Sequence, residues 1–218
     1  MKHLFCSLIS IMLVSLLFSC KKDEPEIINT NTNPTFYNYT QLDVGNYWIY
    51  QRYIVDSSGN ATATEIFDSC YIEKDTAINN KTYYKYVRPV YISDNGTMFV
   101  RDSMNYLVNQ NGKILFSSEN FTDVFADYYI LMSNNDTICR VQERMADKDL
   151  VIETTAGQFP TSSFRSSYDF YPNFSPYGTH RETNTRYALN VGVVSEILPF
   201  FTGNPNYLER RLVRFSVD

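Results

Sequence analysis

Short runs of aromatic and β-branched residues, separated by Asn, Asp and Gly, recur along this chain from residue 36 to its end. The chain has 18 Tyr and 15 Phe, residue types favoured on the pleated, half-buried surface of a strand. About ten short strands at close spacing predict a mainly β fold, a single antiparallel β-sandwich or an open β-barrel. We expect at most one or two short helices in residues 36–218.

Two Asn-Gly pairs predict hairpins, because Asn-Gly accepts the positive φ angles of a tight turn. Asn95-Gly96 would join strands 82–92 and 98–108, and Asn111-Gly112 would lead into a strand at 114–116. Three consecutive strands joined in this way form an antiparallel meander. Further strands are expected at residues 46–55, 137–144, 150–155, 162–170, 186–188, 192–198 and 208–217.

One segment has helical periodicity. Phe121, Val124, Phe125 and Tyr128 fall at helical spacing, after Ser117 and Ser118 as N-cap residues. This pattern predicts a short helix, in competition with the β-favouring residues that follow.

The N-terminus is typical of a secretory signal. Lys2 precedes an apolar run from Leu4 to Phe18, which is shorter than the ~20 residues of a membrane-spanning helix. A single-pass anchor is the alternative. Leu17-Phe18-Ser19-Cys20 resembles a bacterial lipobox. The resemblance implies that residues 1–19 are removed and that Cys20 carries acyl chains, such as palmitate, that hold the protein in a membrane.

The charged residues after Cys20 point to a destination. Lys21, Lys22, Asp23 and Glu24 resemble the lipoprotein export signal of Bacteroidota, which implies the outer membrane and a domain that faces the cell exterior. A solvated charged linker is the alternative. Residues 20–35 are too polar to build a core and predict a flexible tether. Residues 36–218 then form the antiparallel β domain.

Three short motifs extend the resemblance. Gly45-Asn46-Tyr47-Trp48-Ile49-Tyr50, Thr155-Ala156-Gly157-Gln158-Phe159 and Asn190-Val191-Gly192-Val193-Val194 are similar to stretches of a broad group of uncharacterised bacterial lipoproteins. The resemblance implies a β-rich fold and no particular activity. From the residues, we expect Trp48 to anchor the core, and Gly157 and Gly192 to permit turns or bulges.

Catalytic motifs are sparse. His180 is the one His outside the signal, in a loop-like stretch typical of the surface. We find no zinc-binding Cys spacing, nucleophile elbow or phosphate-binding loop. We therefore expect no enzyme activity, no metal and no cofactor. A hydrolase with paired carboxylates is an alternative, with candidates Asp123, Asp127, Glu143, Asp147 and Asp149, although these residues suit a solvated face equally well.

Two cysteines lie within the β domain. Outside the cytoplasm, Cys70 and Cys139 could form a disulfide, or they could be two separately buried thiols.

The segment from 164 to 178 is rich in aromatic residues. Tyr168, Tyr171 and Tyr177 could contact a glycan or an envelope protein, or they could cover one end of the core.

A net charge of −5 argues against binding to nucleic acid. The basic cluster of Arg210, Arg211 and Arg214 predicts a solvated strand edge, with Arg210 and Arg214 on one face. These observations predict a membrane-anchored lipoprotein that serves in binding or in envelope support. A glycan-binding accessory of a nutrient-uptake system is the alternative, and a carboxylate-dependent hydrolase is the second.

Overall fold

Strands make up most of the computed structural model, which describes residues 38–218 apart from 90–95, 177 and 199–205. Residues 36–218 form one compact unit. The signal, Cys20, the export residues 21–24 and the tether lie outside the described residues. Twelve strands are described: β1 Tyr47–Val55, β2 Ala61–Ile78, β3 Lys81–Val87, β4 Thr97–Ser103, β5 Tyr106–Asn109, β6 Ile114–Ser117, β7 Ala126–Leu131, β8 Thr137–Thr154, β9 Gly157–Phe170, β10 His180–Ala188, β11 Gly192–Leu198 and β12 Tyr207–Ser216.

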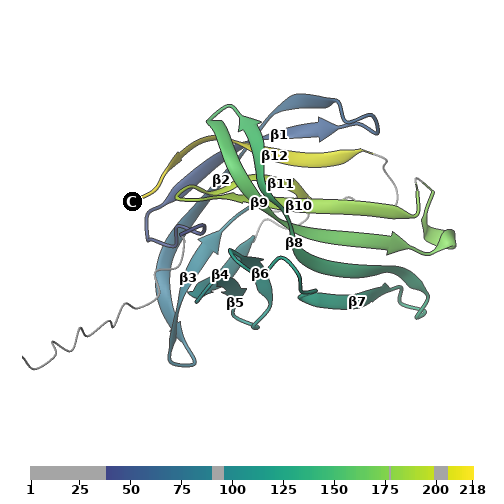
Figure 1. Ribbon diagram of the computed structural model, residues 1–218, viewed down its shortest axis with the longest axis horizontal. Coiled ribbons are helices and arrows are strands. Elements are labelled where there is room, and N and C mark those ends of the chain that lie inside the picture. The colour runs from purple at the N-terminus through teal and green to yellow at the C-terminus, as the bar shows by residue number, and fades with distance from the viewer. Residues whose placement is uncertain (1–37, 90–95, 177, 199–205) are drawn as a thin grey trace, which may run out of the picture. The chain divides into compact units, whose positions relative to one another are not determined.

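All twelve strands belong to one antiparallel sheet, in the order β6-β5-β4-β3-β2-β1-β12-β11-β10-β9-β8-β7. Each strand pairs with its neighbour in sequence, except that β6 and β7 form the two edges and β1 pairs with β12 (Figure 1). The sheet is continuous and open, and it is not a closed barrel. The mainly β prediction is confirmed.

The turns agree in part with the sequence. The Asn111-Gly112 hairpin joins β5 to β6 as predicted, with Gly112 at φ +81°. The strand predicted at 98–108 is instead two strands, because Met104 adopts a φ of +58° and turns the chain between β4 and β5. Of the other predicted hairpin, Asp94 and Asn95 lie outside the described residues.

The helix predicted from the spacing of Phe121 to Tyr128 is wrong. Bends occupy this segment before β7 begins at Ala126, and β7 pairs with β8 from Ala126 to Leu131. The β-favouring residues pair with β8 along one side of this edge strand, and a short isolated helix is marginal in water. The one helical element among the described residues is a 3-10 turn, η1 Pro172–Phe174. No helix in the described part of the chain has the length and apolar character needed to cross a membrane.

The sheet curls so that its two halves enclose a core. The Phe116 ring on β6 lies 4.4 Å from the Tyr187 ring on β10, centroid to centroid. The amide of Ser117 donates a hydrogen bond of 3.2 Å to the sulfur of Met145 on β8. Trp48 is 2% exposed in this core, as predicted. A smaller cluster of Cys139, Val141 and Phe170 lies on β8 and β9.

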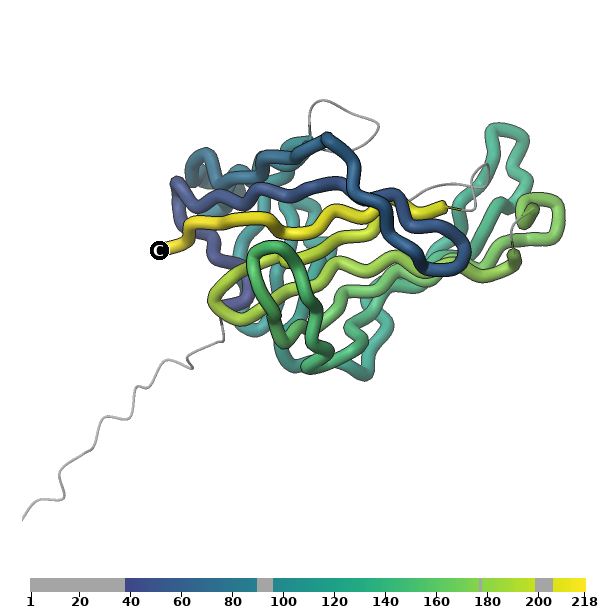
Figure 2. The backbone as a smooth tube through the Cα atoms, turned by 90° about the horizontal axis from the view of Figure 1, so that it is seen from above, coloured from purple at the N-terminus to yellow at the C-terminus, as the bar shows by residue number. Residues whose placement is uncertain are grey.

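The long β8–β9 hairpin folds back over the sheet (Figure 2). The register of the pair shifts between Ala146 and Leu150, which bends the hairpin at this point. Near its tip, the amide of Ala156 donates a 3.3 Å hydrogen bond to the carbonyl of Leu212 on β12. Gly157 and Gly192 have φ angles of +139° and +97°, which confirms the prediction that both glycines permit turns.

Candidate functional site

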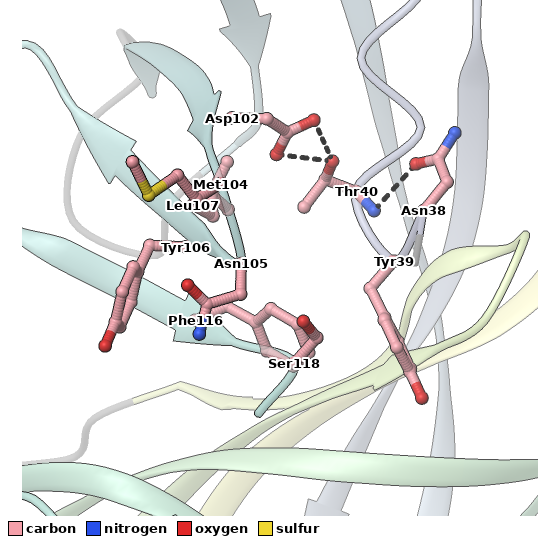
Figure 3. Close-up of a pocket in the computed structure, with 10 residues that line it drawn as sticks. All are labelled: Asn38, Tyr39, Thr40, Asp102, Met104, Asn105, Tyr106, Leu107, Phe116 and Ser118. Carbon is pink, nitrogen blue, oxygen red and sulfur yellow. Dashed lines mark hydrogen bonds between the residues drawn. The ribbon is translucent and has the colours of Figure 1, made fainter. Parts of the chain in front are cut away.

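A cavity of about 320 Å³ lies between residues 38–40 and the β4–β6 meander (Figure 3). This volume is at the lower end of the range of small-molecule sites, roughly 300–1,000 Å³. The wall combines polar, aliphatic and aromatic side chains. The lining residues are Asn38, Tyr39, Thr40, Asp102, Met104, Asn105, Tyr106, Leu107, Phe116 and Ser118.

Residues 38–40 form one wall, and local hydrogen bonds fix the segment 38–42 that contains them. The side-chain oxygen of Asn38 accepts from the amides of Thr40 and Gln41, at 3.3 and 2.9 Å, in the manner of an Asx turn. The carbonyl of Asn38 accepts from the amide of Asn190, at 2.8 Å, which ties this wall to the β10–β11 turn. The buried Asn46 donates to the carbonyl of Gln41, at 3.1 Å. The wall is therefore a preformed part of the domain.

The β4–β5 hairpin supplies the charged group of the cavity. Asp102 pairs with Leu107 across the hairpin, and both side chains line the cavity. The Thr40 hydroxyl donates to both carboxylate oxygens of Asp102, at 2.9 and 2.8 Å (Figure 3). Asp102 is exposed to solvent, and the surrounding protein covers its carboxylate in part. This burial raises the pKa of Asp102 more than the Thr40 hydrogen bond lowers it, and the charge of Asp43 raises it further.

Aromatic rings form the other side of the cavity. The Tyr39 and Phe116 rings lie 5.2 Å apart with their planes tilted by 42°. Behind them, the contact between Phe116 and Tyr187 joins the cavity wall to the core. The Ser118 hydroxyl is buried without a hydrogen-bond partner. A buried hydroxyl normally has a partner, so the Ser118 hydroxyl is an unsatisfied polar group in the wall of the cavity.

A network of buried charges lies elsewhere in the sheet and corrects the prediction for Arg210. Arg210 is not on a solvated edge but 1% exposed, in an ion pair with Glu196 on β11, which Arg88 also contacts. Burial alone would raise the pKa of Glu196, but Arg210 and Arg88 outweigh it and lower the pKa to about 2. The β1–β12 register shifts near Leu212, so Arg214 lies on the opposite face from Arg210. We interpret this network as structural, since Glu196 neutralises Arg88 and Arg210, although the Nε atom of each arginine is buried without a hydrogen-bond partner.

The two cysteines are free and buried, in separate clusters. The structure therefore contains no disulfide between Cys70 and Cys139, and the alternative of two separate thiols is the one observed. Burial raises the pKa of both thiols.

The three tyrosines predicted as ligand contacts lie in different environments. Tyr168 is half-buried and stacks on Phe170, with 6.5 Å between the ring centroids. Tyr171 is 46% exposed. Tyr177 lies outside the described residues. Tyr168 and Tyr171 thus do not share an exposed face.

The acidic residues considered for a hydrolase each have a separate contact or face solvent. Asp127 pairs with Arg140, and Asp147 with Arg165. Glu143 pairs with Lys113 at 2.8 Å. Asp123 accepts from the Asn120 amide at 2.8 Å, and Asp149 is exposed. None of these five lines the cavity of Figure 3.

His180 lies on the surface, as predicted, with 51% of its side chain exposed. Its Nδ1 atom lies 2.7 Å from Asp169, and its Nε2 atom lies 3.4 Å from Glu182. The hydrogen bond to Asp169 raises the pKa of His180, against a smaller effect of burial, and Glu182 raises it further. Within the described ranges, no group of three His, Cys, Asp or Glu residues could hold a metal ion.

The cavity was not found from the sequence. Its residues come from three separate segments, 38–40, 102–107 and 116–118, and carry no motif. Met104-Asn105 was the one local hint of this part of the cavity. Asn favours turns, so this pair could have indicated a turn within the run from 98 to 108 that was predicted as one strand.

Comparisons with known proteins found only remote similarity. No known family and no curated protein matches the sequence. Two solved structures are similar. One is a protein from Bacteroides fragilis NCTC 9343, described as exported and as having a YmcC-like fold, with 14% identity and a TM-score of 0.46. The other is from Parabacteroides distasonis ATCC 8503 and is described as a lipoprotein, with 14% identity and a TM-score of 0.41. Each similarity covers 84% of this chain and 100% of the other. No activity follows from either.

Proposed function

We propose that this protein is a lipoprotein, anchored in the outer membrane through Cys20 and facing the cell exterior, that binds a small molecule without catalysis. The anchor is supported by the lipobox and by the charged residues that follow it. The observation that carries the binding role is the cavity, whose walls are preformed and whose lining includes Asp102 and the unpartnered Ser118 hydroxyl. Preformed, mostly apolar cavities with a few polar groups are typical of ligand sites.

The position of the cavity in the sequence fits this role. Its first wall residue, Asn38, follows the predicted tether of residues 20–35 almost directly. The domain would thus be held at the membrane by a segment that leads into the binding site.

The anchor is tested by Cys20→Ala. We expect this variant to leave the membrane fraction or to remain unprocessed, because no thiol is available for acylation. Replacement of Lys21, Lys22, Asp23 and Glu24 by Ala should keep the protein in membranes but protect it from protease added to intact cells. An acylated, membrane-bound Cys20→Ala protein would disprove the anchor.

The binding role is tested with the full lipoprotein in detergent, by ligand-detected NMR against a fragment library of amines, alcohols, sugars and carboxylates. Ser118→Phe fills the cavity and should abolish binding of any fragment that occupies it. Ser57→Phe, in an exposed turn, makes the same change outside the cavity and should have no effect. Thermal melting confirms that both variants fold. If Ser118→Phe binds the same fragments as the unmodified protein, the cavity is not the site, and envelope support becomes the better hypothesis.

A further inference from the structure

The charge of the cavity is unbalanced. Among the ten described residues that line it, Asp102 is the one with a charged side chain. Its carboxylate has no ion-pair partner within the described residues, whereas the four buried acids, Asp68, Glu143, Glu196 and Glu209, each have one. A carboxylate that is partly removed from water without a cation costs free energy. The cavity would therefore gain most from a ligand that brings positive charge.

Arg101, the basic residue next to Asp102 in the sequence, does not neutralise the Asp102 carboxylate. One terminal nitrogen of Arg101 donates to the backbone carbonyl of Asp102, at 3.2 Å, and not to the carboxylate. Its guanidinium lies over the Tyr83 ring, 5.6 Å from the ring centroid. The other nearby charge, Asp43, is also negative and raises the pKa of Asp102. The negative charges of Asp102 and Asp43 therefore disfavour a negatively charged ligand in this cavity.

The single donor to Asp102 leaves room for another. A carboxylate offers about four acceptor positions on its two oxygens, and among the described residues the Thr40 hydroxyl is the one donor to them. Thr40 holds the carboxylate in a fixed orientation towards the cavity (Figure 3). A ligand N–H could bind the remaining positions without displacing Thr40.

The aromatic walls suit the same kind of ligand. Tyr39 and Phe116 present tilted rings beside the cavity, and Tyr106 adds a third. Aromatic faces attract ammonium groups through the ring quadrupole. Aromatic faces and one carboxylate around a small cavity fit a compact organic cation better than a neutral molecule.

Resting on the binding role proposed above, we infer that the ligand of this cavity is an organic amine in its protonated form, with Asp102 as its counter-ion. Thr40 is a positioning residue, since it acts through the carboxylate. A neutral sugar could bind by hydrogen bonds but would leave the charge of Asp102 unbalanced.

Three probes of equal size and different charge test this inference. Benzylammonium, benzyl alcohol and benzoate carry charges of about +1, 0 and −1 at neutral pH, and glucosamine and glucose repeat the comparison on a sugar. We expect the full lipoprotein to bind benzylammonium at least roughly tenfold more tightly than benzyl alcohol, and to bind no benzoate. Calorimetry and ligand-detected NMR measure the affinities.

Two variants separate charge from hydrogen bonding. Asp102→Asn keeps the shape and an acceptor for Thr40 but removes the charge, so it should abolish the preference for benzylammonium over benzyl alcohol. Thr40→Val removes the hydrogen bond and keeps the charge, so it should keep the preference. Asp136→Asn, an acid in an exposed turn, is the control and should change nothing.

Each outcome decides between the two proposals. Equal binding of the cation and the alcohol, or a preference that survives Asp102→Asn, overturns the amine. If neutral probes bind and Ser118→Phe abolishes their binding, the cavity remains the site and the amine is wrong. If no probe and no fragment binds, both proposals fail.

Discussion

The indole nitrogen of Trp48 donates a 2.6 Å hydrogen bond to the carbonyl of Val191, a residue 143 positions further along the chain. The next residue, Gly192, lies against the same ring. A Cβ atom on Gly192 would come within 3.0 Å of the indole nitrogen. Two of the three motifs found in the sequence thus meet at one contact, which joins the first strand to the β10–β11 turn.

Gly192→Ala should therefore be strongly destabilising. The new methyl group would press on Trp48, and Ala would have to adopt a φ of +97°. We expect a loss of about 3 kcal/mol or more in the free energy of unfolding, from strain and overpacking together. Gly59→Ala is the matched control, because Gly59 has a φ of +85° and a methyl group added there would meet no atom within 4 Å. It should cost only about 1–2 kcal/mol. Urea unfolding measures both, and equal losses would contradict the role of the Trp48 contact.

Glu196→Gln should destabilise the domain at neutral pH by about 3–5 kcal/mol, because it leaves Arg88 and Arg210 buried without their counter-ion. The pKa of Glu196 is lowered to about 2, below the value of about 4.3 in an unfolded chain. The carboxylate thus contributes its stability above about pH 4.3, and this contribution is lost as the pH falls towards 2. The difference between the original protein and Glu196→Gln should shrink over that window. Glu153→Gln, at an exposed position, should show no such difference at any pH.

The imidazole of His180 should titrate above its usual pKa of about 6.5. Asp169 and Glu182 both favour the protonated ring. Because the pKa in the folded protein is raised, the pair stabilises the fold at low pH, and this effect is lost as the pH rises through the pKa of the folded state. The gain is small, since the ring is half exposed. NMR titration of His180 should show a lower pKa in Asp169→Asn, and an unchanged midpoint would contradict the contact.

Cys70 and Cys139 should resist thiol reagents in the folded protein. Both are 0% exposed, and burial raises the pKa of each thiol, so little reactive thiolate forms. Without any reductant, both should react once the chain is unfolded in denaturant. Ser57→Cys, in an exposed turn, is the positive control and should react at once in the folded state. An unfolded chain with no reactive thiol at either position would show that the two are joined in a disulfide after all.

Local sequence patterns predicted the strands well where the residues of the turn between them have a strong preference for turn backbone angles. Asn111-Gly112 marked the β5–β6 hairpin because few residues other than Gly adopt its φ of +81° readily. The patterns failed where tertiary pairing outweighed local preference. The helix predicted from the spacing of Phe121 to Tyr128 is instead largely a strand that pairs with β8. Strict alternation of side chains along a strand predicted Arg214 on the same face as Arg210, but a bulge that the sequence does not reveal moves Arg214 to the other face.

The sequence by itself determined the β class of the domain, and it predicts a lipid anchor at Cys20, because both depend on residue types at short spacing. Only the tertiary structure decided that the strands form one open sheet, that Arg210 is buried beside Glu196, and that residues 38–40 meet Asp102 in a cavity. Contacts of this kind join residues far apart in the chain, such as Thr40 and Asp102, which are separated by 62 positions. They follow from how the whole sheet curls, and no local pattern encodes that curvature.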